Sequence, residues 1–258
     1  MRSENQTEGK RSFAKLIPPL SILGGLCIWE LFVALSDYPA FILPAPSRIV
    51  QRFVSAAKTG ILWPNVWVTF YEVLLGLLLG CGAALIIGYI LAHSPVAEKI
   101  VFPYVVVSQA VPLAAIAPLL IIWFGSGIRP KIVICALTVF FPLLINILVG
   151  YRELESNLSD LFTSMKAGRW ARLKYLEIPG ILPVLLGGLR ISATLSVIGA
   201  VVGELSGADA GLGYLINIAR GQYDTALVFV ALIMLMAIAL GMYGTVIMLE
   251  KLLLGYKS

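Results

Sequence analysis

The sequence predicts an all-α integral membrane protein with six transmembrane helices, and three observations support this fold class. Hydrophobic residues make up 59% of the 258-residue chain, whereas charged residues make up only 13%. A soluble domain usually carries about 25% charged residues, so this chain has too little polar surface for water alone. Apolar windows of about 20 residues, long enough to cross a bilayer, occur six times. This composition excludes a disordered chain, a secreted disulfide scaffold and an ordinary soluble enzyme.

The six windows are bounded by charged residues or by proline and glycine. They are expected at Leu16–Leu35, Val68–Ala92, Tyr104–Phe124, Ile132–Gly150, Val184–Gly203 and Ala226–Leu249. The first lacks a small-residue cleavage site, so we expect a retained anchor rather than a signal peptide. Between the first two windows, a short helix N-capped by Ser47 is expected at the membrane face. Residues 16–250 are predicted to form one transmembrane domain between tails at 1–15 and 251–258.

Basic residues are distributed unevenly between the connections, and this predicts the orientation of the chain. With the N-terminus inside, the cytoplasmic segments hold 12 basic residues and the external segments hold six, leaving Arg190 within the fifth window. The external six are Arg48, Arg52, Lys58, Arg129, Lys131 and Arg220. Because Lys and Arg concentrate in cytoplasmic loops, both termini are expected in the cytoplasm.

Four ionisable residues fall inside the windows, at Glu30, Glu72, Arg190 and Glu204. A charge at the bilayer centre costs about 2.5 to 3.5 kcal/mol on insertion scales, so these residues are expected near span ends. Paired or snorkelling charges are one interpretation. The alternative is that Glu204 joins polar residues facing a central path, because polar groups facing lipid would lack partners. The residues of this predicted path are Ser108, Gln109, Asn146, Ser192, Ser196 and Glu204.

Proline and glycine within the windows predict how the helices bend and pack. Pro112 and Pro118 in the third window and Pro142 in the fourth each remove a helix hydrogen bond and can produce a kink. The Gly-x-x-x-Gly pairs at residues 76–80 and 199–203 allow close approach of helix backbones. That approach could occur within one bundle or at a subunit interface.

Metal and thiol chemistry have no visible site in the sequence. The three cysteines, Cys27, Cys81 and Cys135, lie in apolar runs without cysteine or histidine neighbours, so we interpret them as packing residues. The single histidine, His93, precedes Ser94 and Pro95 at the end of an apolar run, where we expect a solvated loop position.

The connection at residues 151–183 is longer than a turn between two spans requires, and its pattern predicts a bent helical hairpin. Apolar residues first recur at the spacing of one helix face. These residues are Leu158, Leu161, Phe162 and Met165. Gly168 interrupts the stripe, and a second short helix restarts at Trp170 before Pro179 and Pro183 end the segment. Such a hairpin could lie on anionic lipid or fit a groove on a soluble partner.

The same connection resembles a family signature. Residues 160–166, followed by Leu176-Glu177-Ile178-Pro179, are similar to the E-A-A-x3-G-x9-I-x-L-P motif of binding-protein-dependent ABC importer permeases. Asp160 takes the glutamate position, Leu161 and Phe162 take the alanine positions, and Lys166 takes the glycine position. Because Lys166 departs from the motif, Gly168 is expected to supply the bend, through a positive φ.

Further stretches extend the resemblance over roughly residues 29–250, to permeases of the sulfonate, taurine, nitrate and thiamine-precursor group. They lie at residues 43–47, 116–125, 140–142, 188–191, 199–204 and 211–214. The resemblance implies a type I ABC importer transmembrane fold in the bacterial inner membrane, with a cytoplasmic coupling-helix hairpin between the fourth and fifth spans. It also implies a homodimer, an ABC ATPase subunit and an extracytoplasmic solute-binding protein as partners, within a lipid bilayer and without nucleic acid.

The resemblance places ATPase coupling on the hairpin. The coupling residues are expected to be Asp160, Leu161, Phe162, Met165, Lys166, Gly168, Arg169 and Trp170. The chain contains no G-x-x-x-x-G-K-[ST] stretch and hence no P-loop of its own. We therefore expect no catalytic residue, metal or cofactor in this chain, and ATP and magnesium on the partner ATPase.

Two other functional classes are weaker. A secondary transporter, the alternative, would need its own ion-coupling groups and usually an internal repeat. A membrane enzyme would need paired carboxylates, a histidine cluster or an activated nucleophile at a plausible depth. The stretch at residues 192–200 is similar to permeases for thiamine-pyrimidine or riboflavin-type heterocycles, and a sulfonate-like anion is the other expected substrate class.

Overall fold

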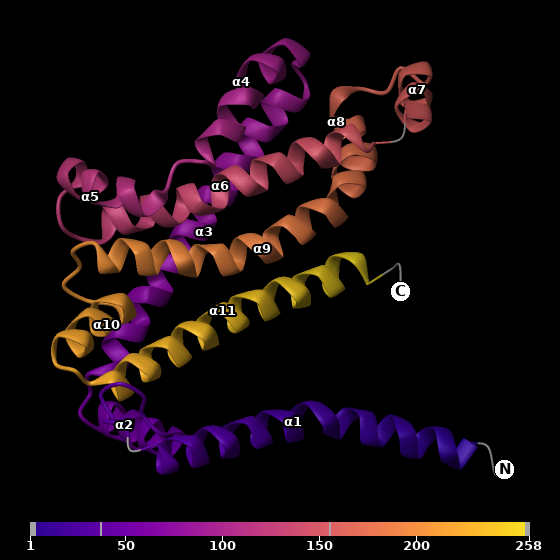
Figure 1. Cartoon of the computed structure of the whole chain (residues 1–258). Helices are drawn as coiled ribbons and strands as arrows, with labels where there is room; N and C mark the ends of the chain where they lie inside the picture. The colour runs from indigo at the N-terminus through magenta and orange to yellow at the C-terminus, as the bar shows by residue number, and fades with distance from the viewer. Residues whose placement is uncertain (1–3, 37, 155, 256–258) are drawn as a thin grey trace. The chain divides into compact units, whose positions relative to one another are not determined.

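The computed structural model describes residues 4–36, 38–154 and 156–255, and every regular element within these ranges is helical. The elements are α1 (Glu4–Leu35), α2 (Pro46–Lys58), α3 (Leu62–Ala92), α4 (Pro95–Ser108), α5 (Leu113–Phe124), α6 (Ile128–Arg152), α7 (Ser156–Ser164), α8 (Arg169–Arg172), the π-helical turn η1 (Leu173–Glu177), α9 (Ile178–Leu205), α10 (Leu212–Gly221) and α11 (Thr225–Leu254) (Figure 1). The all-α fold class is confirmed. Residues 1–3 and 256–258 of the expected tails lie outside the described ranges.

Several of these helices are long and apolar enough to cross a membrane. In the described ranges there are four: α3, α6, the continuous run Arg169–Leu205, and α11. The helices α4 and α5 pass the same test as a pair that is bent by 99°, and Leu20–Leu35 is a shorter apolar helix. The multi-pass character is therefore confirmed, and a total of six spans stays a prediction.

The chain divides into two compact units, of which the first comprises the residues up to Ile61 together with 218–230. Within it, α2 begins at Pro46 after Ala45, and no side chain caps it. The prediction that Ser47 is the N-cap is wrong, because the Ser47 hydroxyl and amide donate to the Glu30 carboxylate at 2.6 and 3.0 Å. Because Pro46 at the first helical position has no N–H, the first turn of α2 has one donor fewer to cap. The Ser47 hydroxyl can therefore donate to the Glu30 carboxylate instead of capping the helix.

The second unit comprises residues 62–217 and the chain from Ala231 onwards, and α6 lies at its centre. Helix α6 packs along both α3 and α9, and Figure 1 shows α6 and α9 side by side. Glycines permit this approach: a Cβ at Gly80 would lie 2.6 Å from the Ala136 carbonyl oxygen, and one at Gly199 would lie 2.8 Å from Cys135 Cα. Both Gly-x-x-x-Gly pairs therefore pack helices within this chain.

The prolines have unequal effects on the helices. The expected kink of the third window is confirmed as a break between α4 and α5 that ends at Pro112, whereas Pro118 and Pro142 lie inside α5 and α6. The prediction that Pro179 and Pro183 end the hairpin segment is wrong, because the helix continues to Leu205. The π-helical turn ends at Glu177, two residues before Pro179, and shifts the hydrogen-bond register ahead of a residue that has no N–H.

Candidate functional site

The predicted hairpin is present as α7 and α8, which Figure 1 shows at one end of the α6 and α9 pair, with α5 at the other end. The apolar face of α7 is uncovered in this chain: Leu158 and Leu161 are exposed and Met165 is 71% exposed. Trp170, which follows the bend, is 76% exposed. Large apolar side chains in such a cluster mark an interaction surface. We call Leu158, Leu161, Met165 and Trp170 the hairpin face.

The remaining expected coupling residues surround this face. Asp160 and Arg169 are exposed, and Phe162 is half-buried. The bend itself differs from the prediction, because Lys166 has a φ of 51°, whereas Gly168 has φ −64° and ψ 158°. The positive φ thus lies at Lys166, the position at which the family motif has glycine.

Backbone hydrogen bonds explain why the lysine adopts this conformation. The Ala167 amide donates to the Phe162 carbonyl and the Lys166 amide donates to the Thr163 carbonyl, both at 3.0 Å. This is the Schellman pattern, which satisfies the last carbonyls of a helix through one left-handed residue. The same backbone turn therefore forms without glycine, at a conformational cost of about 1 kcal/mol.

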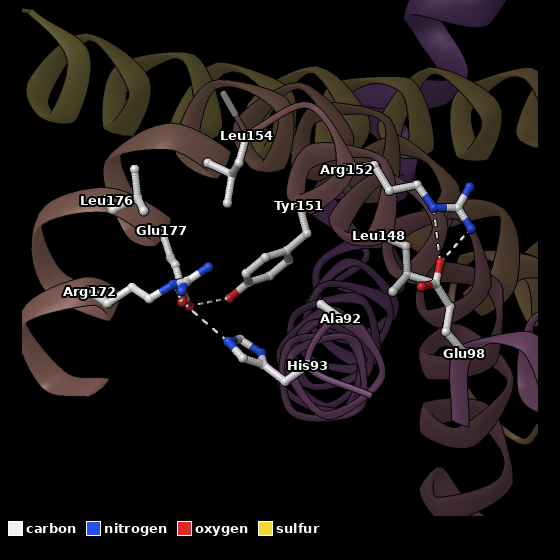
Figure 2. A pocket seen from close by; sticks show the side chains of 10 residues that line it. All are labelled: Ala92, His93, Glu98, Leu148, Tyr151, Arg152, Leu154, Arg172, Leu176 and Glu177. Carbon is white, nitrogen blue, oxygen red and sulfur yellow. Dashed lines mark hydrogen bonds and ion pairs between the residues drawn. The ribbon is translucent and has the colours of Figure 1, made fainter. Parts of the chain in front are cut away.

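A cavity of about 260 Å³ lies at the base of the hairpin, between the ends of α3, α6 and η1. Figure 2 shows the side chains of Glu177, His93, Tyr151 and Arg172 converging on one side of this cavity. We call these four residues the Glu177 hub. His93 Nε2 lies 3.2 Å and Arg172 Nε 3.3 Å from Glu177 Oε1, and the Tyr151 hydroxyl donates to Oε2 at 3.4 Å. The expectation of a solvated loop position is confirmed, because His93 is exposed in the turn after α3, and its ring in addition binds the almost fully buried Glu177 carboxylate.

The opposite side of the cavity carries a separate ion pair. Arg152, at the end of α6, binds the Glu98 carboxylate near the start of α4 and lies over the Phe102 ring, 5.1 Å from its centroid. This pair connects α6 to α4, and its dashed lines in Figure 2 join Arg152 to Glu98. The cavity is thus bordered by one ion pair within the span bundle and by one hub that includes the hairpin.

A second group of charges lies toward the opposite ends of α6 and α9, beside α3. We call it the buried charge cluster: Glu72 in α3, Lys131 in α6 and Glu204 in α9. Lys131 Nζ donates to Glu72 Oε1 at 2.9 Å, and the side chains of the pair are 7% and 0% exposed. The prediction of Lys131 as an external loop charge is wrong, because it lies in α6 and faces α3. The ammonium group compensates carboxylates that could not otherwise remain buried.

Glu204 connects the cluster to the loop that precedes α10. Its carboxylate accepts hydrogen bonds from Thr69 Oγ1 at 2.6 Å and from the Gly213 amide. Thr69 accepts in turn from the Leu212 amide at 2.8 Å. A Cβ at Gly213 would lie 2.8 Å from Glu204 Cβ, so the backbone approaches the carboxylate as only glycine allows. The cluster therefore fastens the loop to α3.

The residues of the predicted path fall into two groups. Ser192, Ser196 and Glu204 are completely buried, whereas Ser108 and Asn146 are partly exposed and Gln109 is exposed at the break between α4 and α5. The Ser196 and Ser108 hydroxyls bond their own helices, to Ala193 and Tyr104. In the described chain, the Ser192 hydroxyl has no hydrogen-bond partner.

The interpretation of charged residues as paired is confirmed at several positions. Glu72 binds Lys131, and Arg190 forms an ion pair with Glu250, whereas Glu30 accepts hydrogen bonds from the neutral Ser47. The Glu177 hub was not predicted from the sequence. Its signal was available in two features: the one histidine of the chain and a glutamate directly before the helix that contains Pro179.

Comparison with known proteins gives a consistent result. Residues 80–253 match the family model of the binding-protein-dependent transport system inner membrane component. The riboflavin transport system permease protein RibX of Chloroflexus aurantiacus is 43% identical over 240 residues, which is 93% of this chain and 90% of the relative. The formylaminopyrimidine transport permease protein ThiX of Halalkalibacterium halodurans is 32% identical over 96% of this chain and 99% of the relative. A putative aliphatic sulfonates transport permease protein, SsuC of Bacillus subtilis, is 32% identical over 90% and 84%.

Proposed function

The chain belongs to the family of binding-protein-dependent transport system inner membrane components, the ABC importer permeases, and from this premise we propose that two identical copies form the membrane part of one transporter. Each copy contributes six spans, with both termini in the cytoplasm. The excess of basic residues in the connections assigned to that side supports the orientation. An ABC ATPase drives the transporter, and an extracytoplasmic solute-binding protein delivers its substrate.

The observation that carries the proposal is the hairpin face. Leu158 and Leu161 lie on one side of the nine-residue helix α7, Met165 directly follows it, and all three are uncovered, although the helix is too short to span a bilayer. A helix with such a face binds by laying it into a hydrophobic groove. We assign that groove to the ATPase subunit, because the hairpin is also the segment that resembles the family's coupling motif.

The translocation path is proposed to pass the break between α4 and α5. Irregular backbone at membrane depth is tolerated only where protein covers it or where it borders a water-filled cavity. Ser108 and Gln109 lie at this break, and Gln109 is exposed. Asn146, Ser192, Ser196 and Glu204 complete the proposed path only when the packing around α9 opens, because three of them are completely buried.

The substrate is proposed to be a small heterocycle of the riboflavin or thiamine-pyrimidine type. The support is similarity to RibX, at 43% identity, and to ThiX. A sulfonate-like anion is the second class, through similarity to SsuC. Uptake of labelled riboflavin and of an alkanesulfonate by vesicles that contain the complete transporter separates the two classes.

Docking is tested by changing Met165→Asp. The new carboxylate would be buried against an apolar groove without a partner, so we expect the ATPase to be lost when the permease is purified from cells that express both. Thr163→Asp is the matched control, because it adds the same charge to the opposite side of α7 and should retain the ATPase. Undiminished complex with Met165→Asp would contradict the docking assignment and would favour a hairpin that lies on lipid.

A further inference from the structure

We propose that Glu177 is a positioning residue for coupling, one that transmits displacement of the hairpin to the ends of α3 and α6. The proposal rests on the proposed function, because it takes the hairpin to be the segment that the ATPase moves. Glu177 lies outside the hairpin face, and its proposed role is to pass the movement of the hairpin on to the spans. Three observations support this role: Glu177 is buried, its three partners come from different parts of the fold, and it lies between the hairpin and α9 beside a cavity.

The Glu177 carboxylate holds three parts of the fold together electrostatically. The Glu177 side chain is 4% exposed and its partners come from three different parts of the fold: His93 after α3, Tyr151 from α6 and Arg172 from α8. A buried carboxylate without partners is costly, so the hairpin cannot move away from α3 and α6 without breaking contacts that stabilise the charge. Movement of α8 must therefore either carry the other two helix ends along or separate the hub.

A short connection joins the Glu177 hub to the hairpin face. Arg172 lies two residues after Trp170, and its amide donates to the Gly168 carbonyl at 3.1 Å, so it is part of the turn that starts at the bend. One residue later the π-helical turn begins, and Glu177 is its last residue. A π-helical turn within a longer helix commonly marks a functional position. The hub thus lies directly between the hairpin face and the long helix α9.

The Glu177 hub has free space beside it. The cavity of about 260 Å³ borders the hub on one side, and the His93 and Arg172 side chains are each 41% exposed. The cavity therefore leaves space into which the side chains of the hub can be displaced when the hairpin moves.

The test uses the complete transporter, permease with ATPase and binding protein, reconstituted in vesicles. Glu177→Gln keeps the size of the side chain and removes its charge. We expect the substrate-loaded binding protein to stimulate ATP hydrolysis about five-fold less than in the unaltered transporter, the lower end of measured couplings between sites. The yield of the complex should stay unchanged, because the hairpin face is intact. Glu98→Gln is the matched control: it removes a carboxylate from the same cavity without touching the hub, and should preserve stimulation.

Two further variants guard against a misfolded protein. Tyr151→Phe and His93→Gln each remove or replace one partner, and each should reduce stimulation in the same direction as Glu177→Gln. When His93→Gln and Glu177→Gln are combined, the losses should be less than additive, because both act on one contact. Wild-type stimulation in Tyr151→Phe and His93→Gln would overturn the proposal, even if Glu177→Gln failed to fold.

The failures of the two proposals can be distinguished. If Glu177→Gln releases the ATPase, Glu177 supports docking rather than transmission, and the further inference is overturned while the docking assignment stands. If Met165→Asp leaves the complex intact, the docking assignment is overturned whatever Glu177→Gln does. If Glu177→Gln and Glu98→Gln reduce stimulation equally, the effect belongs to the cavity as a whole, and the role of Glu177 is overturned.

Discussion

The buried charge cluster and the Glu177 hub lie toward opposite ends of α6 and α9, and they differ in how far water can reach them. At one end, the buried charge cluster holds Lys131 and Glu72 at 7% and 0% exposure and fastens a loop through backbone amides. At the other end, the Glu177 hub borders a cavity, and the His93 and Arg172 side chains are each 41% exposed, although the Arg172 Nε atom itself is buried. Water reaches part of these two side chains, whereas the cluster is closed to it. The difference indicates one fixed end and one adjustable end of α6 and α9.

The largest expected effect is the loss of the cluster's only ammonium group. Lys131→Met leaves two buried carboxyl groups without their cationic partner, and breaking a buried pair in this way costs about 3 to 5 kcal/mol. The free energy of unfolding can be measured by titrating the purified permease in mild detergent with a denaturing detergent.

Arg172→Met makes the corresponding change at the adjustable end and tests the comparison directly. Because the Arg172 side chain is 41% exposed, its loss should lower the free energy of unfolding by about 1 kcal/mol or less. Equal losses for the two variants would break the comparison, since both ends would then be equally dependent on their ion pairs.

A smaller effect is expected in the bend of the hairpin. Lys166→Gly removes the strain of a non-glycine residue at φ 51° and should stabilise the turn by about 1 kcal/mol at most. Hydrogen exchange of the amides of residues 166 and 167, which form the Schellman bonds, should slow by about five-fold for that free energy.

Gly168→Ala is the control for this bend. The φ of −64° suits alanine, and no heavy atom lies within 4 Å of a Cβ placed there. Exchange in this variant should stay unchanged. A larger change for Gly168→Ala than for Lys166→Gly would place the bend at Gly168, as the sequence predicts. The ordered turn at Lys166, which joins the hairpin to the adjustable end, would then be contradicted.

The bend illustrates which features the sequence can and cannot predict. Apolar spacing predicts the helix that contains Leu158 and Met165, because local periodicity reports which face is apolar. The conformation of Lys166 depends on hydrogen bonds to the carbonyls of Thr163 and Phe162, three and four residues before it, and a glycine two residues later is an equally good candidate from sequence alone. Composition likewise predicts the membrane class and the helical fold.

Contacts between residues that are distant in the sequence were the part of the site that could not be predicted. Lys131 contacts Glu72 across 59 residues, and His93 contacts Glu177 across 84. Each residue by itself resembles a loop or span-end charge, and only the packing of α6 against α3 and of η1 near the end of α3 brings the partners together. Charge pairing could be expected as a class, but the identity of each partner could not.

The smallest expected effect concerns Ser192, which lies in the middle of α9, between the fixed end and the adjustable end. Its hydroxyl is buried without a hydrogen-bond partner in the described chain, so Ser192→Ala should change the free energy of unfolding by only a few tenths of a kcal/mol, or raise it slightly. A cysteine at the same position reports on access. In a background in which Cys27, Cys81 and Cys135 are replaced by Ala, we expect Ser192→Cys to react slowly with a small water-soluble thiol reagent.

Gln109→Cys is the matched probe, because Gln109 is exposed at the break between α4 and α5. It should label about ten-fold faster or more if the break borders water, since irregular backbone at membrane depth needs such a cavity. If ATP and the substrate-loaded binding protein accelerate labelling at Ser192→Cys, the packing around α9 opens during transport and the buried serines join the path. If Ser192→Cys labels as fast as Gln109→Cys without ATP, the middle of α9 is open at rest. Fixed packing would then be limited to the buried charge cluster itself.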